Sequence, residues 1–503
     1  MNWGIRMIGL ICKSDAYTYN VYHIMKAFFP SEEIKVRTEE EASHYLMVRL
    51  PDGADNADGK AGKKPQDTGW ITIGEEQAAE AAGDNGDEDE ERQLKYCIDT
   101  CLYHELEKRT GRSLAWGILT GVRPTKIAMQ KSEEGWDREK FVPWFQREFL
   151  VSREKAELSF AIAKRERELL GQLDCENGYS LYVGIPFCPS VCTYCSGALA
   201  DWKDRVWDYL DALQKELTFI GEISAGKKLN TIYIGGGTPT TLTAEQLECL
   251  LNCIDGHFTR EYLLEYTVEA GRPDSITEEK LKGLKKHGIT RISINPQSMQ
   301  QKTLDIIGRR HRVEEIAKAY WLARKMGFHN INMDLIAGLP GEDSADMADT
   351  LKQIGALAPD SLTVHSLAIK RAAKMEFKDL ESDAGETSRV MSDMISLAED
   401  AAHRMGMSPY YLYRQKNIAG NFENVGYAKK GKAGIYNILI MEEKQTIIAA
   451  GAGASTKIVL KEPVPMPGSR KGKMTHLLRS ENVKDVAQYI ERIDEMIGRK
   501  RKL

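Results

Sequence analysis

The architecture of this chain follows from the stretch Leu181-Tyr-Val-Gly-Ile-Pro-Phe-Cys188-Pro-Ser-Val-Cys192-Thr-Tyr-Cys195. An apolar, β-prone run stops at Pro186, and three cysteines follow with the spacing C-x3-C-x2-C. Three thiolates on one loop can hold three irons of an iron–sulfur cube, because thiolate is the usual ligand of such clusters. The fourth iron is then free to bind a molecule that is not protein.

Structural zinc is the alternative interpretation of this triplet. Zinc sites normally have four closed ligands, often as paired Cys or His knuckles. Here the triplet stands alone, since Cys175 lies upstream in a linker and the next histidine downstream is His257. A disulfide is disfavoured because nothing in the sequence marks a secreted protein. The spacing therefore favours the cluster over zinc.

The composition is that of a globular protein with more than one structural unit. The chain has 503 residues, of which 42% are hydrophobic and 28% are charged, and this length predicts two or three units. No signal peptide is recognisable, and no apolar stretch approaches the roughly 18 residues that a membrane span requires. We therefore expect a cytoplasmic protein without a membrane span. The net charge of −5 gives no indication of a nucleic-acid partner.

Residues 1–172 are predicted to form an N-terminal accessory domain that combines an α/β unit with helices. An insertion at about residues 51–92 is rich in Asp, Gly, Ala, Glu and Lys, and we expect it to be disordered because it can bury little apolar surface. The loop Trp116–Lys126 contains Gly, Pro and two cations. It either caps the catalytic unit or is an ordinary turn.

Residues 173–382 show short apolar runs that alternate with amphipathic helices. Alternating βα units predict a parallel sheet with right-handed connections, and six such units fit a partial (βα)6 barrel. Functional side chains of parallel barrels gather at the carboxyl ends of the strands. Strands are expected near residues 181–185, 231–234, 266–269, 291–294, 330–335 and 362–366.

Residues 383–503 are predicted to form a C-terminal α+β module that covers the substrate. A long helix is expected at Thr387–Met405, a pair of strands at Gly434–Met441 and Gln445–Ala449, and a final helix at Val483–Lys500. The glycine-rich turn Gly451–Ser455 either lets this module close over the barrel or is an ordinary turn.

Polar residues follow several successive strands of the predicted barrel. Ile234-Gly-Gly-Gly-Thr-Pro239 comes after the second strand, and its glycines allow a backbone to approach a ligand closely. Any single polar strand end can simply satisfy loop amides, but several together can converge on one bound molecule. These polar strand-end residues are Glu269, Gln297, Arg309 and Asp334.

The cysteine triplet and the glycine-rich loop resemble those of the radical S-adenosylmethionine (radical SAM) enzymes. The lead-in Tyr182-Val-Gly-Ile-Pro-Phe-Cys, the Gly-Gly-Gly-Thr-Pro loop and Asp334-Leu-Ile-Ala-Gly-Leu-Pro340 are similar to the oxygen-independent coproporphyrinogen III oxidase (dehydrogenase) family. Glu269-Ala-Gly-Arg-Pro-Asp274, Tyr413-Arg-Gln-Lys-Asn-Ile-Ala-Gly-Asn421 and Leu119-Thr-Gly-Val-Arg-Pro-Thr-Lys126 resemble its HemZ-type branch.

This resemblance implies a role for each matching residue. Cys188, Cys192 and Cys195 would bind a [4Fe–4S] cluster, and Tyr182 would be the catalytic residue, lying near cofactor and substrate. The residues that would contact S-adenosylmethionine (SAM) are Tyr182, Tyr194, Gly236, Gly237, Thr238, Glu269, Gln297, Arg309, Asp334 and Ala368.

The resemblance also implies the reaction. A 5′-deoxyadenosyl radical would remove hydrogen from propionates of coproporphyrinogen III, and loss of CO2 would leave the vinyl groups of protoporphyrinogen IX. A flavodoxin or ferredoxin would supply the electron. Gly197 replaces a fourth cysteine of the well-studied oxidases, and relatives without it include haem-binding chaperones, which remain the alternative. For the substrate side we expect the segment Tyr410–Tyr427 with Tyr413, Arg414 and Lys416, followed by Lys429, Lys430 and Lys432.

Overall fold

The computed structural model describes residues 7–30, 32–50, 70–74, 90–195, 203–368, 384–415, 422–468 and 473–502. The chain forms two compact units. One contains Met1–Phe160, Glu376–Ser392 and Arg414–Glu423, and the other contains the rest. The predicted domain boundaries stay a prediction, and most of the predicted disordered insertion lies outside the described residues.

The first unit is built on a small mixed sheet with the strand order β2-β1-β3-β4. Strand β1 (Met7–Cys12) pairs in parallel with β2 (Glu33–Thr38) and antiparallel with β3 (Leu46–Arg49), which pairs with β4 (Trp70–Ile73). Helices α1 (Asp15–Phe28) and α3 (Glu90–Thr110) bury their apolar side chains in the same core. The helices that follow are α4 (Thr125–Glu133), α5 (Arg138–Phe149) and α6 (Arg153–Leu170).

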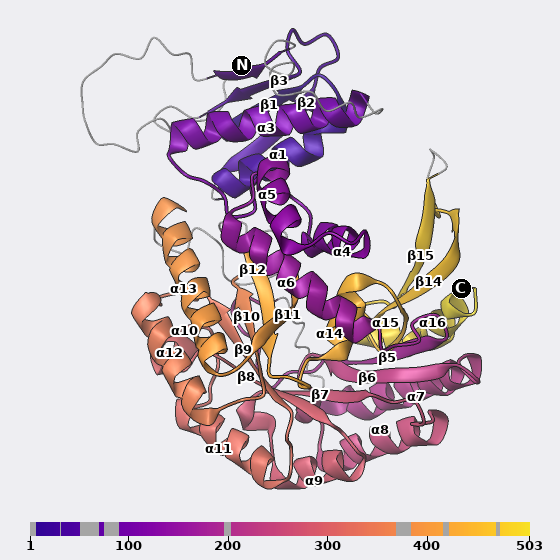
Figure 1. The fold of residues 1–503 in the computed structure, drawn as a ribbon. Coiled ribbons are helices and arrows are strands. Elements are labelled where there is room, and N and C mark those ends of the chain that lie inside the picture. Colours follow the sequence, from indigo (N-terminus) through magenta and orange to yellow (C-terminus); the bar gives the residue numbers. More distant parts are fainter. Residues whose placement is uncertain are drawn as a thin grey trace. The chain divides into compact units, whose positions relative to one another are not determined.

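The second unit contains the predicted partial barrel of six parallel strands. Neighbouring strands from β5 to β10 pair in parallel and in chain order, and helices lie along the outer side of the sheet (Figure 1). The strands are β5 (Gly178–Ile185), β6 (Lys228–Gly236), β7 (Glu265–Gly271), β8 (Arg291–Gln297), β9 (Ile331–Ala337) and β10 (Ser361–Ser366). The connecting helices are α7 (Val206–Ile223), α8 (Ala244–His257), α9 (Glu278–Lys286), α10 (Gln301–Ile306), α11 (Val313–Lys325) and α12 (Ser344–Leu357).

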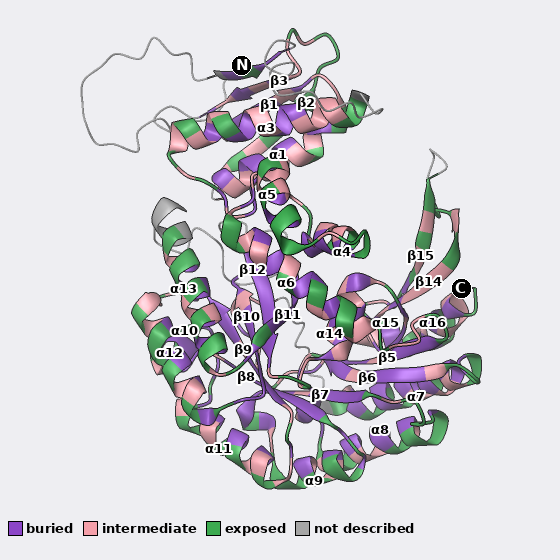
Figure 2. Ribbon diagram, viewed as in Figure 1, coloured by how far each residue is buried: buried purple, intermediate pink, exposed green. Residues whose placement is uncertain are grey.

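Burial explains the sequence pattern of these strands. A strand of a parallel sheet that is covered on both faces reads as a nearly continuous apolar run, and β5 to β10 are almost entirely buried (Figure 2). The helices instead alternate buried and exposed side chains, because only one face of each packs on the sheet. At the start of α8 the Thr243 hydroxyl accepts from the Gln246 backbone N–H at 3.2 Å, which caps the helix.

The sheet continues beyond both ends of the barrel, which the sequence did not indicate. Strand β13 (Thr446–Ala450) lies parallel to β5 and is followed by β14 (Ser455–Pro465) and β15 (Met474–Glu481). At the other end, β12 (Glu423–Ala428) pairs antiparallel with β10 and is followed by β11 (Ser408–Arg414). The C-terminal strands are therefore part of the barrel sheet and do not form a separate sheet.

One predicted strand is a helix. Residues Gly434–Met441 form α14 (Ile435–Glu442), which buries Tyr436, Ile438 and Leu439. An apolar run of this length fits a buried helix as well as a buried strand, and periodicity alone does not distinguish them. The predicted final helix is divided into α15 (Val486–Glu491) and α16 (Ile493–Lys500).

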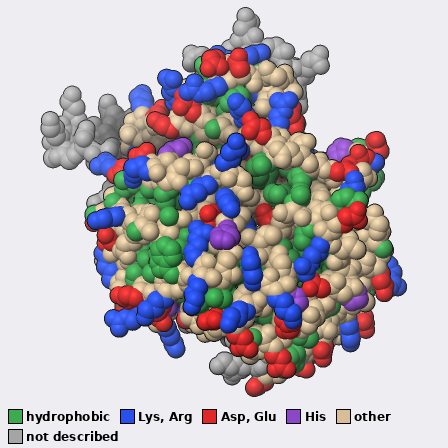
Figure 3. All heavy atoms as spheres, turned by 60° about the horizontal axis from the view of Figure 1, so that its bottom comes forward, with side chains coloured by type: hydrophobic (Ala, Val, Ile, Leu, Met, Phe, Trp, Pro, Cys, Tyr) green, Lys and Arg blue, Asp and Glu red, His purple; other side chains and the backbone are tan. Residues whose placement is uncertain are grey.

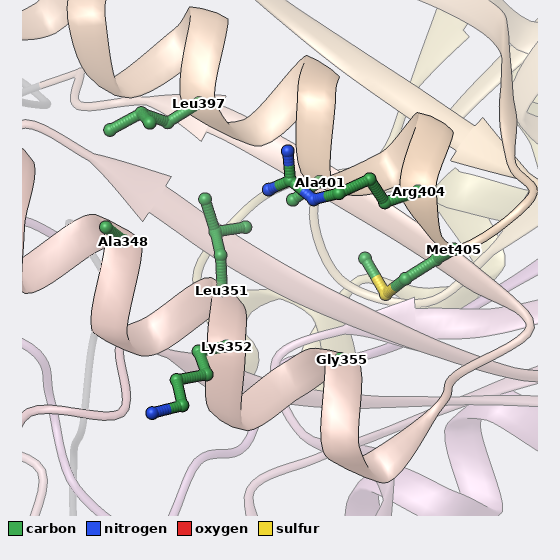
Figure 4. A pocket seen from close by; sticks show the side chains of 8 residues that line it. All are labelled: Ala348, Leu351, Lys352, Gly355, Leu397, Ala401, Arg404 and Met405. Carbon is green, nitrogen blue, oxygen red and sulfur yellow. The ribbon is translucent and has the colours of Figure 1, made fainter.

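Small residues leave a groove of about 290 Å³ between α12 and α13 (Ala384–Arg404). Leu351 extends from α12 toward α13 across it, whereas Lys352 points away (Figure 4). Ala348, Gly355 and Ala401 provide no side chains long enough to fill the space. The two helices therefore pack loosely at this point.

The surface is polar and varied. On the face shown in Figure 3, positively and negatively charged side chains are interspersed, and apolar side chains form separate small groups. Among the described helices, none combines the length and the hydropathy that a membrane crossing would need.

A buried ion pair fastens the C-terminal helix to the barrel. The Lys500 ammonium donates to Glu216 Oε1 at 2.6 Å, and both side chains are almost fully buried. Glu216 Oε2 also accepts from the Gly451 backbone N–H at 2.8 Å and from the Tyr489 hydroxyl at 2.5 Å. Because Gly451 directly follows β13, this pair holds the glycine-rich turn next to β5.

We expect Lys500→Met to destabilise the second unit by about 3–5 kcal/mol, because it leaves the Glu216 carboxylate buried without its cation. Arg499→Ala is the matched control: the neighbouring Arg499 is more than a third exposed and pairs with Glu495 at the surface, where ion pairs contribute little. Denaturant unfolding of both variants is the measurement. Equal shifts of the two midpoints would contradict the role of the buried pair.

Candidate active site

The three cysteines lie on the loop that leaves β5 at its carboxyl end. The Cys195 backbone N–H donates to the Cys192 carbonyl at 3.0 Å, which closes a tight turn. The Thr193 N–H donates to the Ile307 carbonyl at 3.1 Å and ties the loop to the segment after α10. All three cysteines are free thiols. The loop therefore presents three sulfurs from one short segment with a fixed backbone.

The sulfurs are close enough to influence one another. Burial raises the pKa of the Cys188 thiol, the hydrogen bond from the Thr238 hydroxyl at 3.5 Å lowers it, and Cys195 and Cys192 raise it further. Among the described residues, no group of three Cys, His, Asp or Glu side chains is arranged to bind a single metal ion. In an iron–sulfur cube each cysteine binds a different iron, so three thiols on one loop fit this group.

The glycine-rich loop after β6 packs directly against the start of the cysteine loop. The Gly237 N–H donates to the Ile185 carbonyl at 2.7 Å, and the Thr238 N–H donates to the Phe187 carbonyl at 2.6 Å. A Cβ atom at Gly237 would lie 2.5 Å from the Phe187 carbonyl oxygen. Only glycine therefore permits this approach. The two backbones are fixed to each other without a side chain between them.

A second contact that the sequence analysis missed supports the cysteine loop from β7. Arg272 is buried and donates to the Ser190 hydroxyl at 2.5 Å, while its other guanidinium nitrogens donate to Asp274 at 3.0 and 2.7 Å. The signal was present in the motif Glu269-Ala-Gly-Arg-Pro-Asp274. Arg272 and Asp274 in that motif position the loop between the first two cysteines.

Glu269 lies inside the barrel close to the carboxyl end of β7. The Tyr233 hydroxyl donates to its Oε1 at 2.5 Å, and a Cβ atom at Gly235 would lie 2.9 Å from its Cδ. Burial raises the pKa of Glu269 to about 7, the hydrogen bond from Tyr233 opposes that shift, and the charge of Asp334 adds to it. Glu269 can therefore exchange a proton near neutral pH.

Tyr182 belongs to a stack of three tyrosine rings beside Glu269. Its ring is 6.2 Å from those of Tyr233 and Tyr436, and these two rings are 4.4 Å apart. Burial and the charge of Glu269 raise the pKa of Tyr182 above its ordinary value. Tyr182 is thus a neutral phenol, and Tyr233 and Tyr436 are structural partners that sequence reasoning did not identify.

Two of the expected SAM contacts, Gln297 and Arg309, each have a buried polar atom that no described residue satisfies. Gln297 ends β8 with a left-handed φ of 68°, and its buried Oε1 has no hydrogen-bond partner among the described residues. Arg309 donates through one Nη to the Asn295 carbonyl at 2.5 Å, but no residue in the described part of the chain bonds its buried Nε. Buried groups of this kind are rare unless a ligand or water satisfies them.

The Tyr194 hydroxyl contacts both Arg309 and Cys192. Burial raises its pKa, while the charge of Arg309 lowers it and Cys192 raises it. The residue before the third cysteine is therefore linked to the arginine that follows α10. This contact brings the cysteine loop and the end of the β8–α11 connection to one place.

Asp334 lies in the middle of β9, not at its end as expected, and is held by groups on its own strand and on β10. The Asn332 amide donates to its Oδ1 at 2.6 Å, and His365 Nε2 lies 3.7 Å from its Oδ2. Burial alone would raise the pKa of Asp334, but the hydrogen bond and charge of His365 and the Asn332 bond outweigh it, so the pKa is lowered. His365 Nδ1 in turn lies 3.3 Å from the Tyr413 hydroxyl.

His365 is a site residue that the sequence analysis did not predict. It lies on β10 three residues before Ala368, which follows the strand. The sequence signal that could have identified it is a histidine near the end of the strand expected at residues 362–366.

The segment expected to face a substrate has a different role at Arg414. Arg414 is buried, its Nη1 donates to the Leu119 carbonyl at 2.8 Å, and its backbone N–H donates to the Val122 carbonyl at 2.7 Å. Its guanidinium lies 5.6 Å from the centre of the Trp116 ring. Arg414 therefore fixes the Trp116–Lys126 loop through its Nη1 and its backbone N–H, and its contact with a substrate stays a prediction. Gly197 and Lys416 lie outside the described residues.

Comparison with known proteins agrees with this arrangement. Residues 182–354 match the model of the radical SAM superfamily. The solved structure of coproporphyrinogen III oxidase (HemN) from Escherichia coli, described as a radical SAM enzyme, superposes with a TM-score of 0.50 at 22% identity, over 64% of this chain and 70% of that chain. The structural match shows that the two proteins share a fold.

Two curated relatives differ in the extent of the match. The heme chaperone HemW from Bacillus subtilis (strain 168) is 36% identical over 38% of this chain and 51% of its own length. The oxygen-independent coproporphyrinogen-III oxidase-like protein HemZ from the same organism is 42% identical over 419 residues, which is 81% of both chains. The protein therefore belongs to the radical SAM family of oxygen-independent coproporphyrinogen III oxidase-like proteins that includes HemZ, a family that uses a [4Fe–4S] cluster and SAM.

Proposed function

We propose that Cys188, Cys192 and Cys195 each bind one iron of the cluster and that SAM occupies the space beside them. The surrounding residues would be Tyr194, Gly236–Thr238, Glu269, Gln297, Arg309, Asp334 and Ala368. When bound, the cluster and SAM supply a 5′-deoxyadenosyl radical. The observation that carries the proposal is a pair of buried polar atoms, Gln297 Oε1 and Arg309 Nε, that no residue in the described ranges satisfies.

The hydrogen bonds of the glycine-rich loop assign it a specific part in SAM binding. The N–H groups of Gly237 and Thr238 are engaged by Ile185 and Phe187, and the Thr238 carbonyl accepts from the Thr241 N–H, so a ligand at this loop would meet the carbonyls of Gly236 and Gly237. Carbonyls accept hydrogen bonds, and the amino group of methionine donates them. Arg309, as a buried cation, suits the methionine carboxylate.

We propose that the substrate is coproporphyrinogen III and that the reaction is oxidative decarboxylation of propionates to vinyl groups. The curated names of HemZ and of the Escherichia coli oxidase support this substrate class. Tyr182 fits this reaction because its raised pKa keeps its hydroxyl protonated, so that a neutral phenol lies beside the proposed site. The family chemistry requires a one-electron donor such as a flavodoxin or ferredoxin.

The second candidate is a haem-binding chaperone that keeps the cluster but does not decarboxylate. Two observations favour it: the 36% identity to HemW over 38% of this chain, and Gly197 in place of the fourth cysteine of the oxidases.

Cys192→Ser should abolish cluster binding, because two thiolates are too few to hold a cube with an open iron. After anaerobic reconstitution, the wild-type protein should contain about four iron atoms per chain, and the variant should contain almost none. Cys253→Ser is the matched control, since this half-buried cysteine lies on α8 away from the loop. Iron retention in Cys192→Ser would refute the assignment.

His365→Gln should make SAM binding sensitive to acid. Without the imidazole, only the hydrogen bonds from Asn332 and Thr363 oppose burial, so the pKa of Asp334 rises and the carboxylate is protonated at a higher pH. Equilibrium dialysis should show affinity decreasing by about tenfold between about pH 8 and pH 6 in the variant. The wild type and the control His476→Gln on β15 should show a smaller decrease, because Glu269, with a pKa of about 7, is then the carboxylate that takes up a proton in this range. Parallel pH profiles for all three proteins would contradict the role of His365.

The two candidate functions differ in their products. With coproporphyrinogen III, SAM and a reductant under anaerobic conditions, the wild type should form protoporphyrinogen IX, identified by mass. Tyr182→Phe should reduce product formation by about 10²-fold while keeping its iron content. Stable haem binding by the wild type without SAM-dependent CO2 would select the chaperone instead.

A further inference from the structure

A pocket of about 410 Å³ lies at the opposite end of the barrel from the candidate active site. Its lining comes from the segments that precede three strands: Leu264 before β7, Gly288 before β8, and His329 with Asn330 before β9. Lys285 at the end of α9 and Lys432 before α14 complete it. Glu269 and Gln297 lie toward the carboxyl ends of β7 and β8, and Asp334 lies in the middle of β9, so the pocket is separate from the proposed SAM site.

Two lysines place positive charge in this pocket. Lys285 Nζ donates to the Gly327 carbonyl at 2.7 Å, and Lys432 Nζ donates to the His329 carbonyl at 2.7 Å. Each ammonium has three donors, so further donors remain for a ligand. The carbonyls fix where these ammonium groups lie.

Glu265 is the acidic residue of the pocket lining, and protein donors engage both of its carboxylate oxygens. Glu265 Oε2 accepts from the Ile435 N–H at 2.5 Å and its Oε1 accepts from the Thr267 hydroxyl at 2.9 Å. Arg260 lies at the edge, with one Nη 2.8 Å from the position of a Cβ at Gly288, and pairs with Asp255. The charge that faces the open space is therefore positive.

A chain of buried hydrogen bonds connects this pocket with Asp334. Arg291, which is 2% exposed, donates to the Asn330 Oδ1 at 3.0 Å and to the Ser361 hydroxyl at 2.9 Å. Ser361 donates to Asn332 Oδ1 at 3.0 Å, and Asn332 donates to Asp334 Oδ1 at 2.6 Å. Polar groups thus run through the barrel core from the pocket lining to the candidate SAM site.

We propose that this pocket binds a small phosphate-bearing molecule and that its occupancy changes the affinity of the protein for SAM. Lysine ammonium groups bind phosphate as point charges, whereas planar carboxylates are bound best by arginine forks. The volume lies within the range of small-molecule sites. The coupling step rests on the proposed contact between Asp334 and SAM, and the binding step does not.

Calorimetry on the full-length, reconstituted protein tests the binding step, with inorganic pyrophosphate and ADP as probes. Lys285→Ala and Lys432→Ala should each weaken binding at least about tenfold. Lys286→Ala is the matched control, because the adjacent Lys286 is exposed and pairs with Glu248. Tighter binding of ADP would identify a nucleotide site, and equal binding a site for the phosphates alone. No binding of either probe, or equal loss in all three variants, would overturn the site.

Equilibrium dialysis of SAM with and without the better probe tests the coupling. A saturating probe should change SAM affinity by between about 5- and 150-fold, and Ser361→Ala should remove this effect while probe binding persists. An unchanged SAM affinity in the wild type would overturn the coupling and leave the site intact. Failure to bind SAM at all would instead count against the proposed function.

Discussion

The close backbone contact between the cysteine loop and the glycine-rich loop is the constraint on which the site depends. Gly237 and Thr238 donate to the carbonyls of Ile185 and Phe187 at 2.7 and 2.6 Å, and a Cβ at Gly237 would block the contact. Because β5 and β6 are neighbouring parallel strands, their loops emerge at the same end of the sheet. The strands that follow place further polar side chains, Glu269 on β7 and Gln297 on β8, at the same end of the sheet. Arg272 and Arg309 contact the cysteine loop at Ser190 and Tyr194.

Two buried carboxylates inside the barrel are held in different states by their surroundings. Burial raises the pKa of Glu269 to about 7, although hydrogen bonds from the Tyr233 hydroxyl and the Gly236 backbone N–H oppose the shift. Asp334 is equally enclosed, but His365 and Asn332 lower its pKa. Surroundings that move the pKa values of two carboxyl groups in opposite directions give the two groups different chemical roles. Glu269 can carry a proton near neutral pH, whereas Asp334 remains an acceptor for hydrogen bonds.

The sequence predicted the barrel because its strands are buried on both faces and therefore read as apolar runs between amphipathic helices. It predicted the strand-end residues because parallel strands bring their carboxyl ends together. It was wrong for Ile435–Glu442, where an apolar run of eight residues is a buried helix. Strands β14 and β15 are partly exposed along their length, so their sequences show no clear alternation of apolar and polar residues. The roles of Arg414 and His365 depend on contacts between distant segments, which periodicity does not reveal.

The central claim is that three thiolates hold an incomplete cube whose open iron binds SAM. The most direct measurement is electron paramagnetic resonance of the anaerobically reconstituted, reduced protein before and after addition of SAM. The account predicts the signal of a low-potential [4Fe–4S] cluster whose shape changes when SAM is added, because SAM binds the iron itself. A signal that is unaffected by SAM, or zinc in place of iron in the purified protein, would contradict it.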